Sequence, residues 1–275
     1  MKEQAEEGLT DLHSHLVPGV DDGARTVDES LEGLGRMVDA GYRVLATTPH
    51  FDGSLTLDPE KFGRRMEEMD EGWSVLVEAA AARYPDLSLF RGHEVMLDVP
   101  APDLSDSRLH LADGAWVLVE WPRLQVPPGT SRVLERLIDT GVRPLIAHPE
   151  RYRGIDRELA IVERWISLGA ALQVNLGSLA GRYGEGARTL AFRLLRRGWV
   201  SCMGSDFHGR PHLDLYVDEA RALLTEVDGV DQWRLLTSTN PGRVLGGESP
   251  LPVAELSPAG GFWNRIKGFF GTQYP

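Results

Sequence analysis

Short apolar runs and longer amphipathic segments alternate along this chain. The apolar runs are rich in Val, Leu, Ile and Ala with little polar alternation, which is typical of parallel strands buried on both faces. They predict strands at residues 9–13, 43–48, 87–91, 115–120, 143–147, 170–175 and 199–203. The amphipathic segments predict helices at residues 27–40, 59–83, 131–140, 157–168, 186–197 and 212–226. About seven β–α units indicate an α/β fold with a parallel sheet, either closed as a barrel or open and doubly wound.

Cap residues agree with these helix boundaries. Glu29 follows Thr26 by three residues, the spacing of a capping box at the start of a helix. Glycines at positions 41, 141, 169 and 198 come just after predicted helices, where a left-handed residue often ends the helix. No internal repeat or long linker interrupts residues 9–246. We therefore expect one domain over residues 9–246, preceded by an N-terminal tail of residues 1–8.

Potential metal ligands recur at the carboxyl ends of the predicted strands. His13 and His15 lie two residues apart where the first strand ends, and if the extended backbone continues through residue 15 both side chains project to the same face. Asp21 and Asp22 follow in the next loop. The remaining candidates end or follow later strands: His50, Glu94, Glu120, His148, Asp206 and His208. Because parallel strands of a barrel all end at one face, where active sites lie, we expect these side chains to meet.

Each of these residues alone has an ordinary explanation as a surface or capping side chain. Strand ends that supply His, Asp or Glu one after another are difficult to attribute to chance. Imidazole and carboxylate ligands without thiolate suit Mn²⁺, Fe or Zn²⁺, and the share of carboxylates favours Mn²⁺ or Mg²⁺. The number of candidates exceeds what one ion uses, so two or three ions are expected.

Composition narrows the classes of function. The formal net charge of −12 favours attraction of metal ions and argues against broad contact with nucleic acid phosphates. The single cysteine, Cys202, excludes a disulfide within the chain and a cysteine-rich zinc site. The first residues lack the apolar core of a signal peptide, and no apolar run is long enough to span a membrane. We therefore expect a cytoplasmic protein.

Three motifs resemble the polymerase and histidinol phosphatase (PHP) superfamily. They are His13-Ser14-His15 with Asp21-Asp22-Gly23, the run Ile146-Ala147-His148-Pro149-Glu150-Arg151-Tyr152, and Gly204-Ser205-Asp206 with His208. The acidic pair at 21–22, where other members often have a third histidine, resembles the bacterial protein-tyrosine phosphatase branch of the capsule and exopolysaccharide type. The resemblance covers about residues 9–246. It implies a distorted (β/α)7 barrel with the metal site at the C-terminal ends of the strands.

The resemblance also implies a trinuclear site, with manganese as the expected metal. One ion would take His13, His15, Glu94 and Asp206, a second would share Glu94 and add Glu120 and His148, and the third would take Asp22, His50 and His208. Whether Asp21 or Asp22 is the ligand stays open, although the family match favours Asp22. Arg151 and Arg210 match arginines that hold the phosphate, and their alternative role is a structural ion pair with the acidic rim.

The reaction implied is hydrolysis of phosphotyrosine on a protein, such as a bacterial tyrosine kinase of exopolysaccharide or capsule synthesis, by a metal-bridging hydroxide. The phenol of tyrosine has a pKa near 10, so it departs without much protonation, whereas an alkyl alcohol needs a strong general acid. Outside the expected ligands, His93 and His212 are the candidates for that acid. A cysteine mechanism is disfavoured, because His208 stands where the Cys-x5-Arg motif needs arginine after Cys202, which is better interpreted as a buried apolar residue.

Two other functions stay open: a small-molecule PHP phosphatase of the histidinol phosphate type, and a non-catalytic, metal-stabilised binding module. A PHP nuclease is disfavoured by the negative charge. Residues 247–275 indicate a Pro- and Gly-rich linker followed by an aromatic and basic stretch at 262–270. One helical face of that stretch could contact a membrane surface, bind a partner or pack on the domain itself. A face of the helix at 27–40 could support a homo-oligomer.

Overall fold

Parallel strands form two sheets in this protein. The computed structural model describes residues 8–227 and 229–256. Within these residues the strands are β1 (Leu9–Asp11), β2 (Tyr42–Thr47), β3 (His50–Asp52), β4 (Ser88–Arg91), β5 (Glu94–Met96), β6 (Trp116–Glu120), β7 (Arg143–Ala147), β8 (Ala171–Asn175) and β9 (Cys202–Gly204). One sheet has the order β1-β2-β4 and the other the order β3-β5-β6-β7-β8-β9. Every paired strand in these ranges runs parallel to its neighbour.

The two sheets continue each other around a distorted barrel. β3 follows β2 after a bend at Thr48 and Pro49, β5 follows β4 in the same way, and β3 pairs with β5 just as β2 pairs with β4. The circuit is closed by a parallel bridge between Ser14 and Phe207, where the backbone N–H of His15 donates to the Phe207 carbonyl at 2.8 Å. This circuit of seven strand positions confirms the expected (β/α)7 barrel. The sequence did not reveal β3 and β5, because three-residue strands carry no periodic pattern.

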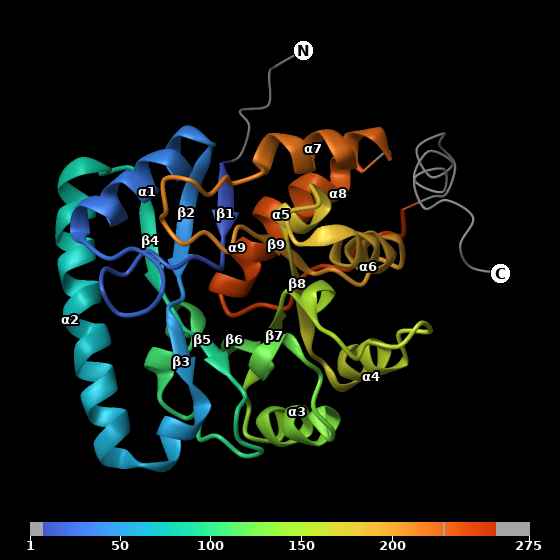
Figure 1. Ribbon diagram of the computed structural model, residues 1–275, viewed down its shortest axis with the longest axis horizontal. Helices are drawn as coiled ribbons and strands as arrows, with labels where there is room; N and C mark the ends of the chain where they lie inside the picture. The colour runs from blue at the N-terminus through green and yellow to red at the C-terminus, as the bar shows by residue number, and fades with distance from the viewer. Residues whose placement is uncertain (1–7, 228, 257–275) are drawn as a thin grey trace.

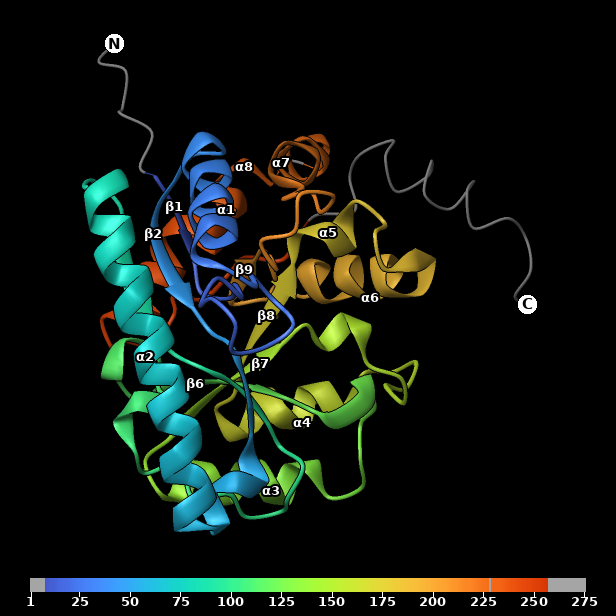
Figure 2. The same ribbon diagram turned by 60° about the vertical axis from the view of Figure 1, so that its left-hand side comes forward.

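Helices surround the strands. They are α1 (Val27–Asp39), α2 (Pro59–Arg83), α3 (Thr130–Asp139), α4 (Ala160–Leu168), α5 (Leu176–Leu179), α6 (Gly184–Arg196), α7 (Val217–Glu226), α8 (Val230–Arg234) and α9 (Asn240–Leu245), with a π-helix, η6 (Leu235–Thr239), before α9. The long α2 runs beside α1 along one side of the barrel, and α3 lies beside α4 (Figures 1 and 2).

Local capping decides where several helices begin. The expected cap of α1 is confirmed, since the Thr26 hydroxyl accepts a hydrogen bond from the Glu29 N–H at 3.2 Å. Helix α7 begins at Val217 and not at residue 212, because Tyr216 before it adopts a left-handed backbone with φ of +56°. Helix α4 begins at Ala160 and not at residue 157. The Ala160 N–H at its start donates a hydrogen bond to the Asp156 carboxylate at 3.1 Å. These local hydrogen bonds and dihedral angles were not visible in the hydrophobic pattern.

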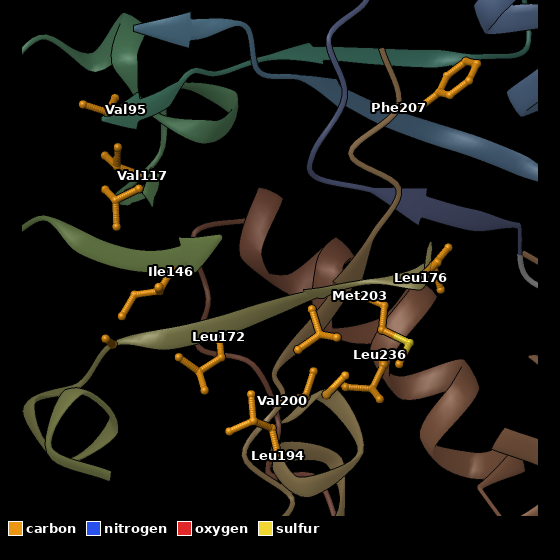
Figure 3. Close-up of a cluster of buried hydrophobic side chains, with 14 of the residues drawn as sticks. Val95, Val117, Ile146, Leu172, Leu176, Leu194, Val200, Met203, Phe207 and Leu236 are labelled. Atoms are coloured by element: carbon orange, nitrogen blue, oxygen red, sulfur yellow. The ribbon is translucent and has the colours of Figure 1, made fainter. Parts of the chain in front are cut away.

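Alternation along each strand divides the core into two layers. Side chains such as Val95, Val117, Ile146 and Leu172, on neighbouring strands, belong to the larger layer that packs against the helices (Figure 3). The next positions along the same strands point to the opposite face and fill the smaller inner layer, which includes Trp116, Leu118, Leu145, Ala147, Ala171 and Cys202. Continuing the same two-residue period along β6 and β8 leads from this inner layer to Glu120, Gln173 and Asn175. The barrel interior therefore changes from apolar to polar toward the carboxyl ends of the strands.

The first part of the expected linker lies on the domain. The Asn240 side chain makes two hydrogen bonds with the backbone of Leu251. Its Oδ1 accepts from the Leu251 N–H at 2.7 Å, and its Nδ2 donates to the Leu251 carbonyl at 3.0 Å. The Trp116 indole donates to the Glu248 carbonyl at 2.9 Å. Residues 247–256 are thus attached to the barrel, and the aromatic and basic stretch at 262–270 lies outside the described residues. Among the helices that the structure describes, none is long and apolar enough to cross a membrane.

Helix α1 turns its apolar residues toward the protein interior. Leu34 and Met37 are buried in the larger core layer, and Leu31 packs against the same layer. This described helix therefore has no large exposed apolar side chain, and the suggestion that one of its faces could support a homo-oligomer stays a prediction.

Candidate metal centre

All nine predicted ligands come together at the carboxyl ends of the barrel strands. His13, His15, Glu94 and His148 are buried, whereas Asp22 is exposed at the edge of the cluster. Ligand atoms converge within 4.8 Å of one another in four overlapping groups: His15, Asp22, His50 and His208; His13, His15 and Glu94; His13, His148 and Asp206; and His50, Glu94 and Glu120. Residues that are almost 200 positions apart in sequence thus share one site.

The Glu94 carboxylate lies at the centre of the cluster. Its Oε2 atom is 3.2 Å from His13 Nε2, 3.4 Å from His15 Nε2 and 3.1 Å from His50 Nδ1. Its Oε1 atom is 2.8 Å from His148 Nε2. Asp206 Oδ1 completes the inner group, at 3.4 Å from His13 Nε2 and 3.5 Å from His15 Nε2. A single carboxylate can therefore serve more than one cation position.

A second group lies toward the surface. Asp22 Oδ1 is 3.5 Å from His50 Nε2 and 3.3 Å from His208 Nε2. The other ring nitrogen of His50, Nδ1, faces inward to Glu94 and lies 3.5 Å from Glu120 Oε1. His50 thus connects the two groups, whereas the resemblance placed it with the third ion alone. His148 is close to Glu94 but 4.0 Å from Glu120 Oε2.

Unpartnered buried atoms show that the cluster fits a cation. His13 Nε2, His15 Nε2 and Glu94 Oε2 are buried without a hydrogen-bond partner among the described residues. Leaving such atoms unsatisfied is costly, and buried polar groups normally have a partner. Nitrogen and oxygen donors at these separations are ligands that Mn²⁺, Fe and Zn²⁺ accept. The residues present therefore fit bound divalent cations.

The charges of the cluster compensate one another. Burial disfavours the protonated form of His13, but the Glu94 and Asp206 carboxylates overcome this effect and raise the pKa of His13 to about 9. Burial disfavours the charged form of Asp206 and by itself would raise its pKa, yet His13 and His15 hold that pKa well below its usual range. Carboxylates at this depth require positive charge nearby, which protons on histidine or metal cations supply.

The two neighbouring aspartates have different roles. Asp21 Oδ2 accepts hydrogen bonds from His15 Nδ1 at 2.8 Å and from the His50 N–H at 3.0 Å, and Asp21 Oδ1 accepts from the Gly23 N–H. This carboxylate orients His15 so that Nε2 faces the cluster. Asp22 instead directs its Oδ1 to His50 and His208, as a ligand would.

Two amides that the sequence analysis missed orient further ligands. Carboxylates only accept hydrogen bonds, so the Asn175 amide must donate to Asp206 Oδ2, at 2.8 Å. This direction leaves Asn175 Oδ1 to accept from Gln173 Nε2 at 2.9 Å, and Gln173 Oε1 then accepts from His13 Nδ1 at 2.7 Å. The proton of neutral His13 is thereby placed on Nδ1, and Nε2 is free to bind a cation. Two polar residues in an otherwise apolar strand, at the inner positions of 170–175, were the available signal.

The cluster opens into a cleft of about 540 Å³, which Arg151 and Arg210 also line. Arg151 Nη1 donates to Asp206 Oδ2 at 2.6 Å, and its guanidinium lies over the Tyr183 ring at 4.2 Å from the centroid. Arg210 Nη2 donates to the Asp22 carbonyl at 2.9 Å, and its Nη1 lies 3.6 Å from Glu29. Both arginines therefore lie beside the cluster. Arg151 makes the ion pair with the acidic rim that was its alternative role, whereas Arg210 pairs with Glu29, which lies outside the cluster.

Three side chains outside the ligand set can now be placed. His93 is buried, donates from Nδ1 to the Arg108 carbonyl at 3.0 Å and lies against Phe51. It does not line the cleft where a general acid would act. His212 does line it. Cys202 is buried within β9, and burial raises the pKa of its thiol, which argues against a thiolate nucleophile.

A closed parallel barrel with imidazoles and carboxylates gathered at its carboxyl end is the arrangement that the PHP resemblance implies. The chain belongs to the family described as capsular polysaccharide synthesis, CpsB/CapC, whose model matches residues 9–246. This match confirms the family resemblance seen in the sequence.

Relatives and a solved structure agree with this family. The chain is 27% identical over 231 residues to the tyrosine-protein phosphatase YwqE of Bacillus subtilis, covering 83% of this chain and 89% of the relative. It is 26% identical over 251 residues to the tyrosine-protein phosphatase CpsB of Streptococcus pneumoniae, covering 86% and 98%. A crystal structure from work on YwqE and CpsB, described as unique metal-dependent tyrosine phosphatases, superposes with a TM-score of 0.72 at 26% identity, covering 90% of this chain and all of that one.

Proposed function

We propose that this protein is a metal-dependent phosphatase that hydrolyses phosphotyrosine on proteins. The observation that carries the proposal is the convergence of His13, His15 and Glu94, whose buried ligand atoms lack partners within the described residues. A CpsB/CapC family match supports the same activity, since relatives of this chain are named tyrosine-protein phosphatases. We further propose a tyrosine kinase of capsule or exopolysaccharide synthesis as the substrate protein.

The proposed ligands are the nine residues of the cluster, with Mn²⁺ as the proposed metal. Clustered divalent cations neutralise phosphate charge and lower the pKa of water at neutral pH. His13 and His15 present Nε2 because their Nδ1 atoms bind Gln173 and Asp21. Asp22 is proposed as the ligand of the acidic pair, because the Asp21 carboxylate is occupied by His15 and by backbone N–H groups.

Arg151 and Arg210 are proposed to bind the non-bridging phosphate oxygens. Arg151 lines the cleft, and its Nε–H has no hydrogen-bond partner among the described residues. Its planar guanidinium suits bidentate phosphate binding. Since the phenolate of tyrosine departs without much protonation, the site does not require a strong general acid for this substrate.

The proposal is tested with a phosphotyrosine peptide and the matching phosphoserine peptide. We expect hydrolysis of the phosphotyrosine peptide at a rate at least tenfold higher, because the alkoxide of serine is the poorer leaving group. Stripping the protein with EDTA should abolish hydrolysis, and adding Mn²⁺ should restore it.

Two controls separate this mechanism from its rivals. Iodoacetamide should leave the rate unchanged, since Cys202 is buried. The His148→Ala variant should lose at least 100-fold in kcat/KM. Equal rates for the two peptides, or faster turnover of histidinol phosphate, would contradict the proposal.

A further inference from the structure

We infer that arginines at the mouth of the cleft select phosphotyrosine segments that carry acidic residues beside the phosphotyrosine. The inference rests on the proposed function and adds the chemistry of the substrate around the reacting phosphate. Acidic and basic side chains are segregated within the cleft. Its acidic lining residues, Asp22, Glu94, Glu120 and Asp206, all belong to the ligand cluster. Its basic lining residues outside the cluster are Arg123, Arg151, Arg182, Arg210 and His212.

Arg123 carries a positive charge at one side of the mouth. It is exposed, lines the cleft and forms no ion pair with residues 8–227 or 229–256. The turn that carries it, η4 (Pro122–Leu124), follows β6 only two residues after Glu120, and Arg123 has a left-handed backbone with φ of +58°. A non-glycine residue rarely adopts this conformation, and such strain is concentrated at functional positions. The fold thus holds an unpaired guanidinium beside the cluster at a cost in backbone energy.

Arg182 carries a second positive charge, next to the phosphate-binding arginine. Its guanidinium lies over the rings of Tyr183 and Tyr216, at 5.3 and 5.9 Å from their centroids, and its Nη1 is 3.5 Å from the Tyr216 hydroxyl. Tyr183 in turn lies under Arg151. Aromatic rings therefore position Arg182, and within the described chain no carboxylate neutralises it.

The two exposed arginines, Arg123 and Arg182, contrast with the negative charge of the whole molecule. A chain with a net charge of −12 repels acidic peptide segments in general. Positive side chains around the cleft are therefore needed for an acidic segment to bind there. Leu124, Leu213 and Tyr183 also line the cleft and offer contacts for an aromatic ring. A peptide whose phosphotyrosine enters the cleft would place its neighbouring residues at Arg123 and Arg182.

The test compares two phosphotyrosine peptides of equal length, one with Asp and Glu on both sides of the phosphotyrosine and one with Asn and Gln there. We expect the manganese-loaded protein to prefer the acidic peptide about tenfold in kcat/KM. Arg123→Gln and Arg182→Gln should each reduce this preference about threefold, which is the scale of one exposed charge pair. The preference should also shrink between roughly 0.05 and 0.5 M salt, because salt screens exposed charges.

Matched variants make the result specific. Arg132→Gln, an exposed substitution on α3 outside the cleft, should retain the full preference, and Arg182→Lys should retain most of it. A variant that is merely misfolded lowers kcat/KM for both peptides and leaves their ratio unchanged. A wild-type ratio near one, or a ratio that the double variant Arg123→Gln/Arg182→Gln leaves intact, would overturn the inference while the phosphatase proposal stands. Hydrolysis of neither peptide would instead contradict the proposed function.

Discussion

At the scale of single residues, hydrogen-bond direction decides which nitrogen of a histidine faces the site. The Asp206 carboxylate can only accept, and this fixes the orientation of the Asn175 amide, then of Gln173, and finally the tautomer of His13. Two ligands from opposite ends of the chain are thus oriented by one buried chain of amides. Gly204 leaves the space for it, because a Cβ atom there would lie 2.6 Å from Gln173 Nε2.

Replacing Gln173 should therefore weaken metal binding without removing a ligand. In Gln173→Leu the Nδ1–H of His13 loses its acceptor, and we expect the dissociation constant for Mn²⁺ to rise about 10- to 100-fold, as for other residues that orient ligands. Isothermal titration of the EDTA-stripped protein measures this change. Gln173→Glu keeps an acceptor for His13 and should recover part of the affinity. Unchanged affinity in Gln173→Leu would show that the amide chain does not orient the site.

At the scale of elements, the loop between β1 and α1 brings two aspartates back over the strand end. The Ala24 N–H donates to the His15 carbonyl at 3.0 Å, and the Gly19 N–H donates to the Ala24 carbonyl at 2.8 Å. This close return depends on Gly23, where a Cβ atom would lie 2.1 Å from the His15 carbonyl oxygen. The loop can lie against β1 only because residue 23 has no side chain.

The Gly23→Ala variant should disturb both stability and the site. Displacing the loop should lower the free energy of unfolding by roughly 1–3 kcal/mol, the usual cost of overpacking, and should weaken Mn²⁺ binding because Asp21 and Asp22 move with it. Urea unfolding and metal titration measure the two effects. The matched control is Gly63→Ala in α2, where nothing lies within 4 Å of the added methyl and a gain of about 0.5–1 kcal/mol is expected.

At the scale of the whole molecule, the charged cluster links stability to pH and metal. In the metal-free protein, protonated His13 is paired with buried carboxylates, and its folded pKa of about 9 exceeds the ordinary value of 6.5. A raised pKa adds stability that is fully present below 6.5 and is lost as the pH rises through 9. A bound cation would take over the role of the protons.

Metal-free protein should therefore lose thermal stability between pH 6.5 and 9, whereas the manganese-loaded protein should change little over that range. The Tm difference between the two forms should grow by several degrees as the pH rises. Differential scanning calorimetry at fixed ionic strength measures it. A difference that does not grow as the pH rises would show that His13 is not held protonated in the metal-free fold.

The sequence by itself predicted about seven parallel β–α units, the helix cap at Thr26 and the candidate ligand positions, and the family resemblance added that the strands close into a barrel. Buried strands and amphipathic helices have hydrophobic periods that local sequence records. In a parallel barrel the carboxyl ends of all strands lie at one face, so residues that follow the strands are expected to meet there. Only the tertiary structure decided that Asp21 orients His15 while Asp22 faces the cluster. It also decided that His50 connects the inner and outer groups of ligands, and that Gln173 and Asn175 orient His13 and Asp206. These facts depend on the direction of hydrogen bonds between residues distant in sequence, which no local pattern records. The short strands β3 and β5 were hidden for a related reason, since they are defined by pairing with neighbouring strands and not by a pattern in their own residues.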